Sequence, residues 1–203
     1  MNSELLENHK RYIERKALYK SFGYDVDKER KYILEHAKPF YGRVLEAGTG
    51  KGHFVLALAK KGYSFVTFDI SAQEQRFAKL NIAYHGFDKQ VEFKIENAER
   101  TSFDDGSFDT IFSVNVLHHL KNVHIVIEEL LRILTPKGKL ILADFTEEGF
   151  KVMDKIHSLE GNKHEVGKVG LVDVESYLMK KGFSVKKRES KYQCVLVAQK
   201  DGV

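Results

Sequence analysis

A glycine-rich turn carries the strongest chemical signal in this sequence. Residues Glu46-Ala47-Gly48-Thr49-Gly50-Lys51-Gly52 place three glycines at alternate positions directly after a short apolar stretch. Glycine adopts positive φ angles and lets a ligand approach the backbone closely. The turn leads into the start of a predicted helix, where unpaired N–H groups favour a carboxylate or a phosphate. A tight turn without a ligand is the alternative, but three glycines in five residues favour a cofactor site.

Two further polar positions follow the next apolar stretches. Asp69 lies 21 residues after Gly48, and its carboxylate can accept hydrogen bonds from both hydroxyls of a ribose. Asp69 could also cap the helix that follows it, and the two roles are compatible. Asn97-Ala98-Glu99 comes after the third apolar stretch. Taken alone, Asn97 would be a surface turn residue.

The elements that must position these residues alternate between strands and helices. Strands are expected over residues 43–47, 64–68, 91–95, 108–113 and 139–145. Helices are expected over residues 52–60, 71–84 and 122–134, the second capped by Ser71 and the third ended by Thr135-Pro136-Lys137-Gly138. This alternation predicts an α/β fold with a doubly wound, mostly parallel sheet and helices on both faces. Ligands of such sheets bind beyond the carboxyl ends of the strands, where the strand order reverses.

Both ends of the chain depart from the alternation. Residues 4–38 are predicted to be helical, with an interruption at residues 21–24 because glycine weakens a helix. After a helix over 173–181, two strands over 183–188 and 192–198 follow too closely for a helical crossover, so we expect an antiparallel pair at the end of the sheet. The sequence therefore predicts an N-terminal helical cap over residues 1–38. A domain with a seven-stranded sheet, its final strand antiparallel, is expected over residues 39–203.

The spacing of the glycines distinguishes two classes of cofactor. A dinucleotide fingerprint reads Gly-x-Gly-x-x-Gly, whereas here the third glycine comes one residue early and position 53 is histidine. An acidic residue followed by three alternating glycines after the first strand resembles the class I S-adenosylmethionine methyltransferases, which have a Rossmann-like fold. The resemblance extends over roughly residues 44–145 through three more segments, which are Phe103–Ser113, Val114–Leu120 and Leu131–Leu140.

This resemblance implies a methyltransferase that uses S-adenosylmethionine and releases S-adenosylhomocysteine. It is closest to the broad subgroup that methylates small molecules by in-line displacement. It also implies that Asn97 holds the adenine amino group, where Asp is commoner in the family and where the Asn amide oxygen can accept the same bond. The residues expected to bind the cofactor are Tyr24, Glu46, Ala47, Gly48, Thr49, Gly50, Gly52, Asp69, Ile70, Asn97, Ala98, Glu99 and Val114.

Two histidines follow the fourth predicted strand, close to the expected position of the transferred methyl group. Adjacent residues do not share a face, so we expect one of His118 and His119 to point toward the pocket. A methyltransferase needs a general base only where the acceptor must lose a proton, and histidine titrates near neutral pH. We select His119 as the candidate catalytic residue. For each histidine, ordinary packing or a hydrogen bond to a backbone carbonyl is the alternative.

Residues 146–170 form a longer connection than the resemblance implies. Apolar residues recur every three positions from Phe150 to Ile156, which predicts a helix at the carboxyl edge of the sheet. We expect this connection to be a lid that shapes the acceptor pocket. Asp154, His157 and His164 would admit a metal ion, but a solvated polar face is the preferred interpretation and no metal is expected.

Composition limits the remaining possibilities. Lys and Arg exceed Asp and Glu by four in 203 residues, which gives little reason to expect nucleic acid or a membrane. The single cysteine, Cys194, excludes a disulfide framework and a thiolate metal cluster. No signal peptide or membrane span is apparent, so a cytoplasmic protein is expected. Basic clusters such as residues 186–188 could contact RNA, but a solvated face explains them more simply.

A small-molecule acceptor is preferred by elimination. The fourth strand is not followed by Asn-Pro-Pro-Tyr, which would suggest methylation of an amino group on adenine or glutamine, and no cysteine lies near that loop to attack a cytosine ring. The alternatives are an RNA or protein methyltransferase, a non-catalytic protein that binds S-adenosylmethionine, and an NAD-dependent oxidoreductase.

Overall fold

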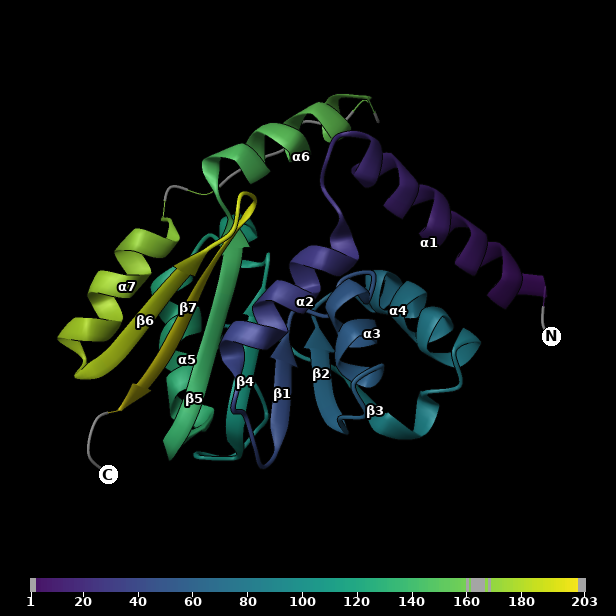
Figure 1. The fold of residues 1–203 in the computed structure, drawn as a ribbon. Coiled ribbons are helices and arrows are strands. Elements are labelled where there is room, and N and C mark those ends of the chain that lie inside the picture. Colours follow the sequence, from purple (N-terminus) through teal and green to yellow (C-terminus); the bar gives the residue numbers. More distant parts are fainter. Residues whose placement is uncertain (1–2, 160, 162–166, 168, 201–203) are drawn as a thin grey trace.

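The central feature of the molecule is a mixed sheet with helices on both faces (Figure 1). The computed structural model describes residues 3–159, 161, 167 and 169–200. In these residues seven strands pair in the order β3-β2-β1-β4-β5-β7-β6, and β7 is antiparallel to both of its neighbours. The strands are β1 Val44–Ala47, β2 Phe65–Asp69, β3 Val91–Ile95, β4 Phe108–Val114, β5 Leu134–Phe145, β6 Phe183–Glu189 and β7 Gln193–Lys200. The predicted fold class is confirmed.

Seven α-helices in the described part of the chain surround this sheet. They are α1 Ser3–Ser21, α2 Val26–Ala37, α3 His53–Ala59, α4 Ala72–Tyr84, α5 Val123–Ile133, α6 Glu147–Leu159 and α7 Leu171–Lys180, with short 3₁₀ turns at Asp88–Gln90 and Leu117–His119. The predicted break in the N-terminal helix is confirmed, because α1 ends at Ser21 and Gly23 has a φ of 87°. Among the described residues no helix combines the length and apolar character that crossing a membrane requires.

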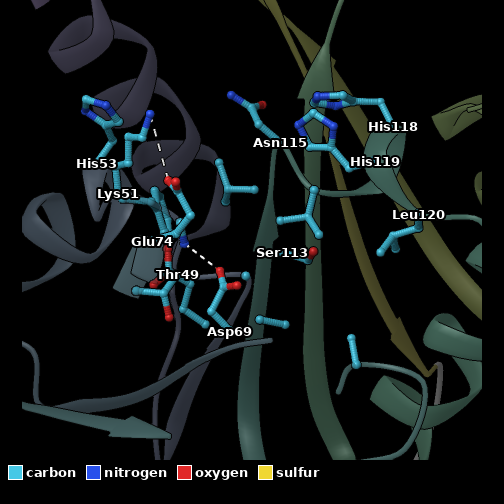
Figure 2. A pocket seen from close by; sticks show the side chains of 18 of the residues that line it. Thr49, Lys51, His53, Asp69, Glu74, Ser113, Asn115, His118, His119 and Leu120 are labelled. Atoms are coloured by element: carbon cyan, nitrogen blue, oxygen red, sulfur yellow. Dashed lines mark hydrogen bonds and ion pairs between the residues drawn. The ribbon is translucent and has the colours of Figure 1, made fainter. Parts of the chain in front are cut away.

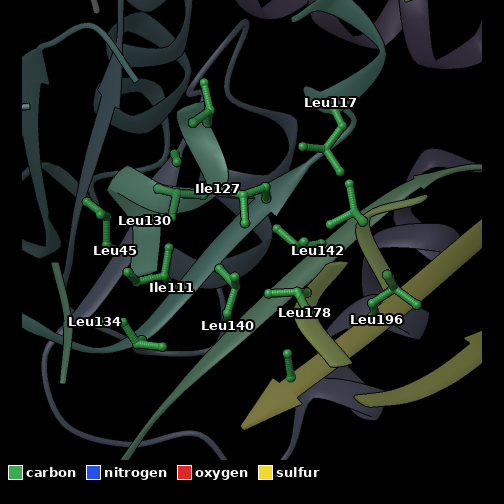
Figure 3. Packing of buried hydrophobic residues seen from close by; sticks show 14 of the residues in the cluster. Leu45, Ile111, Leu117, Ile127, Leu130, Leu134, Leu140, Leu142, Leu178 and Leu196 are labelled. Atoms are coloured by element: carbon green, nitrogen blue, oxygen red, sulfur yellow. The ribbon is translucent and has the colours of Figure 1, made fainter. Parts of the chain in front are cut away.

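Alternating residues of the central strands form two hydrophobic layers. Leu45, Ile111 and Leu140 face α5 and α7 on one side of the sheet (Figure 3). Their neighbours Val44 and Phe112 pack on the other side, where α2, α3 and α4 cover the sheet. Because successive side chains of a strand point to opposite faces, the buried strands need apolar residues at every position. The two layers hold the strand ends rigidly, and those ends carry the polar residues singled out in the sequence.

The strand order reverses between β1 and β4, which lie side by side in the middle of the sheet. The chain leaves β1 toward α3 and leaves β4 toward α5, on opposite faces. The loops after these two strands therefore separate and open a crevice at the carboxyl edge. The glycine-rich turn follows β1 and the two histidines follow β4, so both line the crevice.

Two helical segments meet above this crevice. The connection between α1 and α2 packs against α6, in a cluster of buried apolar residues that includes Tyr24, Val26, Met153 and Ile156. In Figure 1, α6 spans the upper edge of the sheet and α1 runs alongside α4. The helix predicted from the spacing of Phe150 to Ile156 is thus present. The proposed division of the chain at residue 38 stays a prediction.

One predicted turn differs from the structure. Thr135-Pro136-Lys137-Gly138 was expected as a connection, but β5 already begins at Leu134, directly after α5. Leu134 pairs with Phe108, and the next pair is Lys139 with Thr110, so residues 135–138 form an irregularity within the strand. A side chain at Gly138 would approach Leu134 Cδ1 to 2.6 Å, which explains the glycine. The helix does end at Ile133, as the proline predicts.

Candidate functional site

A pocket of about 730 Å³ occupies the crevice at the carboxyl edge. This volume is typical of small-molecule and cofactor sites. Its walls come from the turn after β1, the ends of β2, β3 and β4, the N-terminal helices and α6. The predicted site residues that line it are Tyr24, Glu46, Ala47, Gly48, Thr49, Gly50, Asp69, Ile70, Asn97, Ala98, Glu99, Val114 and His119. Figure 2 shows Thr49 and Asp69 on one side of this pocket and His118 and His119 on the other.

The glycines of the turn have different structural roles. Gly48 has a φ of 94°, and a side chain there would approach Val116 Cγ2 to 2.3 Å. Gly50 has a φ of 49° and faces open space. Gly52 does not line the pocket; a side chain there would clash with Ala78 of α4 at 2.7 Å. The structure thus explains Gly52 by the packing of α3 against α4, and its contact with a cofactor stays a prediction.

Asp69 is held at the pocket rim by backbone groups. Its Oδ2 accepts a hydrogen bond from Gly50 N at 2.7 Å, and its Oδ1 accepts one from Ser71 N at 2.8 Å. Each carboxylate oxygen keeps a further lone pair for a ligand hydroxyl. The helix cap is Ser71, whose Oγ accepts a hydrogen bond from Glu74 N. Asp69 is therefore fixed in place, and Ile70 beside it leaves 70% of its surface exposed at the pocket.

Glu46 is a buried carboxyl group on the floor of the pocket, with 1% of its surface exposed. It accepts a hydrogen bond from the Thr67 hydroxyl at 2.7 Å, and Thr67 in turn contacts the Thr49 hydroxyl. Burial raises the pKa of Glu46 to about 8, against the opposing effects of Thr67 and the nearby Arg30. A cationic ligand group beside Glu46 would favour its ionised form.

The segment after β3 forms a compact turn. Asn97 Oδ1 accepts a hydrogen bond from Glu99 N at 2.9 Å, and Asn122 donates to the Glu99 carboxylate at 3.0 Å. Ala98 packs against the hydrophobic layer beneath it. These bonds fix the backbone of the turn and still leave the Asn97 side chain exposed at the pocket. The turn lines the pocket, and its contact with an adenine ring stays a prediction.

The two histidines differ in their surroundings. His118 is buried, and its Nδ1 lies 2.6 Å from Asp144 Oδ1. Asp144 also accepts hydrogen bonds from the backbone N of His118 and of Phe145. His119 is exposed at the pocket, and its ring centroid lies 3.9 Å from that of His118. Figure 2 shows both imidazoles side by side, pointing from the loop toward the pocket.

Asp144 had no signal in the sequence, because it lies within β5 and meets His118 only when that strand pairs with β4. The role of His119 as a catalytic residue stays a prediction. The buried carboxylate of Asp144 is paired with His118.

The opposite wall carries several basic groups from the N-terminal helices and from α3. Arg15, Arg30 and His53 line the pocket there, beside Tyr19 and Tyr24. Desolvation and the cationic side chains of Arg30 and Arg15 lower the pKa of His53 to about 3. The imidazole is therefore neutral at pH 7. Arg30 and His53 were not predicted from the sequence, since neither stands in a recognisable motif.

The helix α6 contributes Met153 and His157 to the pocket. This placement supports the lid hypothesis for residues 146–170, which stays a prediction. His164, one of the three residues considered for a metal ion, lies outside the described residues. Within the described part of the chain, no group of three His, Cys, Asp or Glu side chains is arranged to hold a metal ion.

Comparison with known proteins identifies the central segment. The family model of the methyltransferase domain matches residues 45–142. This segment is a class I S-adenosylmethionine-dependent methyltransferase domain. The predicted family and the predicted cofactor, S-adenosylmethionine, are confirmed. The matched segment contains the glycine turn, Asp69, the Asn97 turn and both histidines, but not Arg30 or Asp144.

Individual relatives are similar over the same region. A ubiquinone biosynthesis O-methyltransferase of Chelativorans sp. (strain BNC1) is 32% identical over 108 residues, covering 53% of this chain and 42% of the relative. A 2-methyl-6-phytyl-1,4-hydroquinone methyltransferase of Synechocystis sp. is 34% identical over 106 residues, covering 51% of this chain and 32% of the relative. The chain thus spans less than half the length of these curated relatives.

The fold is also found in solved structures. A SAM-dependent methyltransferase from Aquifex aeolicus matches with a TM-score of 0.65 and 22% identity, over 83% of this chain and 88% of that one. At this level of identity the comparison shows the fold, and it includes most of the described elements.

Proposed function

We propose that this protein transfers the methyl group of S-adenosylmethionine to a small molecule whose reacting atom carries a proton. The buried pair of His118, which lines the pocket, and its partner Asp144 carries this proposal, because such a pair can remove the proton of a hydroxyl or an amine. When bound, S-adenosylmethionine supplies a sulfonium methyl group that is activated for in-line displacement. The protein's own part is to align the acceptor, exclude water and accept its proton.

The residues of the matched domain fit the cofactor. We assign the ribose hydroxyls to Asp69, whose two oxygens are fixed by backbone N–H groups. The turn from Asn97 to Glu99 and the exposed Ile70 would hold the adenine ring. The open space at Gly50 suits the part of the ligand that crosses the turn. Glu46 would face the ammonium group of the methionine part.

Proton removal would use the nitrogen of His118 that faces away from Asp144. In that role Nδ1–H donates to Asp144, Nε2 accepts the proton of the acceptor, and the buried carboxylate stabilises the imidazolium that forms. Asp144 is fixed by the backbone N–H groups of His118 and Phe145, so it acts as a positioning residue. His119 lies within contact of the same ring and remains a second candidate for the base.

The acceptor end of the pocket is largely apolar. Tyr19, Tyr24, Phe145 and Met153 line it, together with the histidines. Apolar and aromatic walls with a few polar groups suit a small organic acceptor. Two relatives support this class, since their names refer to ubiquinone biosynthesis and to a hydroquinone. We further infer that residues 146–170 act as a lid over this end and that the protein works in the cytoplasm, where Cys194 stays reduced.

An assay with labelled cofactor tests the proposal. The protein is incubated with methyl-labelled S-adenosylmethionine and a panel of phenols, aliphatic alcohols and amines, and both the label and S-adenosylhomocysteine are measured. We expect transfer to at least one hydroxylated compound, and its loss in His118→Asn. Binding of S-adenosylhomocysteine without transfer to any panel member or to a metabolite extract would favour a non-catalytic binding protein. Methyl transfer to RNA or protein but to no small molecule would contradict the proposed small-molecule acceptor.

A further inference from the structure

The pocket contains a buried arginine whose role is not accounted for by the ligand contacts assigned to the glycine turn and Asp69. Arg30 of α2 leaves 8% of its surface exposed and lines the pocket. Its Nε has no hydrogen-bond partner among the described residues, and no ion pair of those residues includes Arg30. A buried guanidinium without an anionic partner is costly. Its presence at a cofactor pocket therefore indicates that a ligand supplies the anion.

Other side chains hold Arg30 in position without neutralising it. With its amide oxygen toward the guanidinium, Asn115 accepts from Arg30 Nη2 at 3.0 Å and from Nη1 at 3.2 Å. The Asn115 amide nitrogen then donates to Gln193 Oε1 at 3.0 Å, and Gln193 Nε2 donates to the Tyr24 hydroxyl at 2.9 Å. Tyr24 also accepts from Arg30 Nη1 at 3.4 Å, which closes a ring of neutral hydrogen-bond partners.

The backbone of Asn115 supports a functional interpretation of this ring. Among the described residues, Asn115 alone is a non-glycine residue with a positive φ, at 57°. Such a conformation is unfavourable for most residues and least so for asparagine. It occurs directly after β4, where the side chain reaches both Arg30 and Gln193. A strained residue at a ligand pocket is often retained because it positions another group.

Two neighbours define what the arginine could bind. Arg30 lies close enough to Glu46 to oppose the rise in the pKa of that carboxyl group, yet the two side chains form no ion pair, and Glu46 is held by Thr67 instead. His53, on the same wall, has a buried Nδ1 without a partner among the described residues. A carboxyl group, a guanidinium and a neutral imidazole around one end of a pocket match an α-amino acid. The carboxyl group would face its ammonium and the other two its carboxylate.

We infer that Arg30 is the receptor for the carboxylate of the methionine part of the cofactor, with His53 Nδ1 as a second donor and Asn115 as the positioning residue. This inference rests on the proposed cofactor site. It also gives the N-terminal helices a role in ligand binding that the matched domain, residues 45–142, cannot supply by itself.

A pair of ligands isolates this contact. S-adenosylhomocysteine carries the carboxylate, and its decarboxylated analogue keeps the nucleoside, the sulfur and the amine. Calorimetric titration of the wild type should show a preference of roughly 10- to 100-fold for S-adenosylhomocysteine, the range of a hydrogen-bonded charge pair. In Arg30→Met the preference should fall to within about threefold, mainly through weaker binding of S-adenosylhomocysteine. Arg30→Lys keeps the charge but loses the paired donors, so it should be intermediate.

Two variants complete the experiment. Lys31→Met removes an exposed cation from the same helix, since Lys31 pairs only with Glu35 among its described neighbours, and it should keep the full preference. Asn115→Asp puts a carboxylate beside Arg30, so it should reduce the preference even if Arg30→Met fails to fold. The inference is overturned if Arg30→Met or Asn115→Asp keeps the wild-type preference, or if Lys31→Met loses it equally. Failure of the wild type to bind either ligand would instead reject the proposed function, and the inference with it.

Discussion

The two sides of the pocket are built in different ways. The side that we assign to the nucleoside consists of the glycine turn, Asp69 and the turn at Asn97, and its shape depends on backbone geometry within residues 45–142. The rest of the pocket depends on side chains whose partners come from distant parts of the chain, such as Arg30 with Asn115 and His118 with Asp144. Binding of the nucleoside part is thus a local property of the strand ends and turns within residues 45–142. Acceptor chemistry and the methionine end depend on how the terminal segments pack on them.

The largest effect is expected from a substitution that impairs proton removal from the acceptor and leaves the nucleoside site unchanged. Asp144→Asn should lower kcat by roughly 10²- to 10⁴-fold, because His118 loses the carboxylate that orients its ring. Binding of S-adenosylhomocysteine should stay within about twofold of the wild type. Steady-state kinetics on the first acceptor found, together with calorimetry, measure both quantities.

A double-mutant cycle separates this positioning role from a general loss of stability. If Asp144 acts through His118, the variant that combines Asp144→Asn with His118→Asn should be no slower than His118→Asn alone. Additive losses in kcat would contradict the account, as would a rise in the KM for the acceptor without a change in kcat.

The next effect tests whether the nucleoside side really depends on backbone geometry. Gly48→Ala combines a positive φ with a close contact to Val116, so it should lower stability by about 2–4 kcal/mol and weaken cofactor binding. Gly50→Ala is the matched control, because its φ is also positive but its side chain would meet open space; about 1 kcal/mol is expected. Urea denaturation gives both values. Equal losses in the two variants would show that the contact with Val116 has no effect.

A smaller effect is expected from the ribose contact. Asp69→Ala should weaken the binding of S-adenosylhomocysteine by roughly 1–3 kcal/mol, since charge-assisted hydrogen bonds would be lost. Asp69→Asn keeps the side-chain shape and one acceptor oxygen, and it should lose less. Unchanged affinity in Asp69→Ala would remove this residue from the site.

The smallest effect concerns pH and links the two sides through Glu46. Its pKa is raised from 4.5 to about 8 by burial, so the ligand-free protein should lose stability as pH rises through this interval, while the unfolded chain is already ionised. Binding of a ligand with an ammonium group should have the opposite trend. Affinity for S-adenosylhomocysteine should rise about tenfold between pH 6.5 and 8.5. Glu46→Gln should abolish both trends, and a persistent pH dependence in that variant would assign them to another group.

The sequence predicts most of the fold because the responsible signals are local. Short apolar stretches, Ser71 at a helix start and the break at Gly23 each specify an element from neighbouring residues. The prediction of a connection at residues 135–138 was wrong. There β5 pairs with β4 from Leu134 onward, and strand pairing is set by contacts distant in sequence. Tertiary pairing therefore overrides a local turn signal at that place.

The residues of the candidate site also differ in whether local signals in the sequence predict them. The glycine turn, Asp69 and Asn97 could be selected from spacing alone, since a parallel sheet brings successive strand ends to one edge. Arg30, Asn115 and Asp144 could not, because each acquires its partner only when remote elements pack together. The choice between His118 and His119 also needed the position of Asp144. The spacing of residues in the sequence predicts which loop contains the functional residues. The packing of remote elements determines which side chain of that loop forms a hydrogen bond or ion pair.

One set of titrations tests this division most directly. S-adenosylhomocysteine is titrated into the wild type, Asp69→Ala and Asp144→Asn under identical conditions. The account predicts binding of one equivalent to the wild type, clearly weaker binding to Asp69→Ala and wild-type affinity for Asp144→Asn, which would be inactive as a methyltransferase. It would be contradicted if the wild type did not bind, or if Asp144→Asn lost as much affinity as Asp69→Ala.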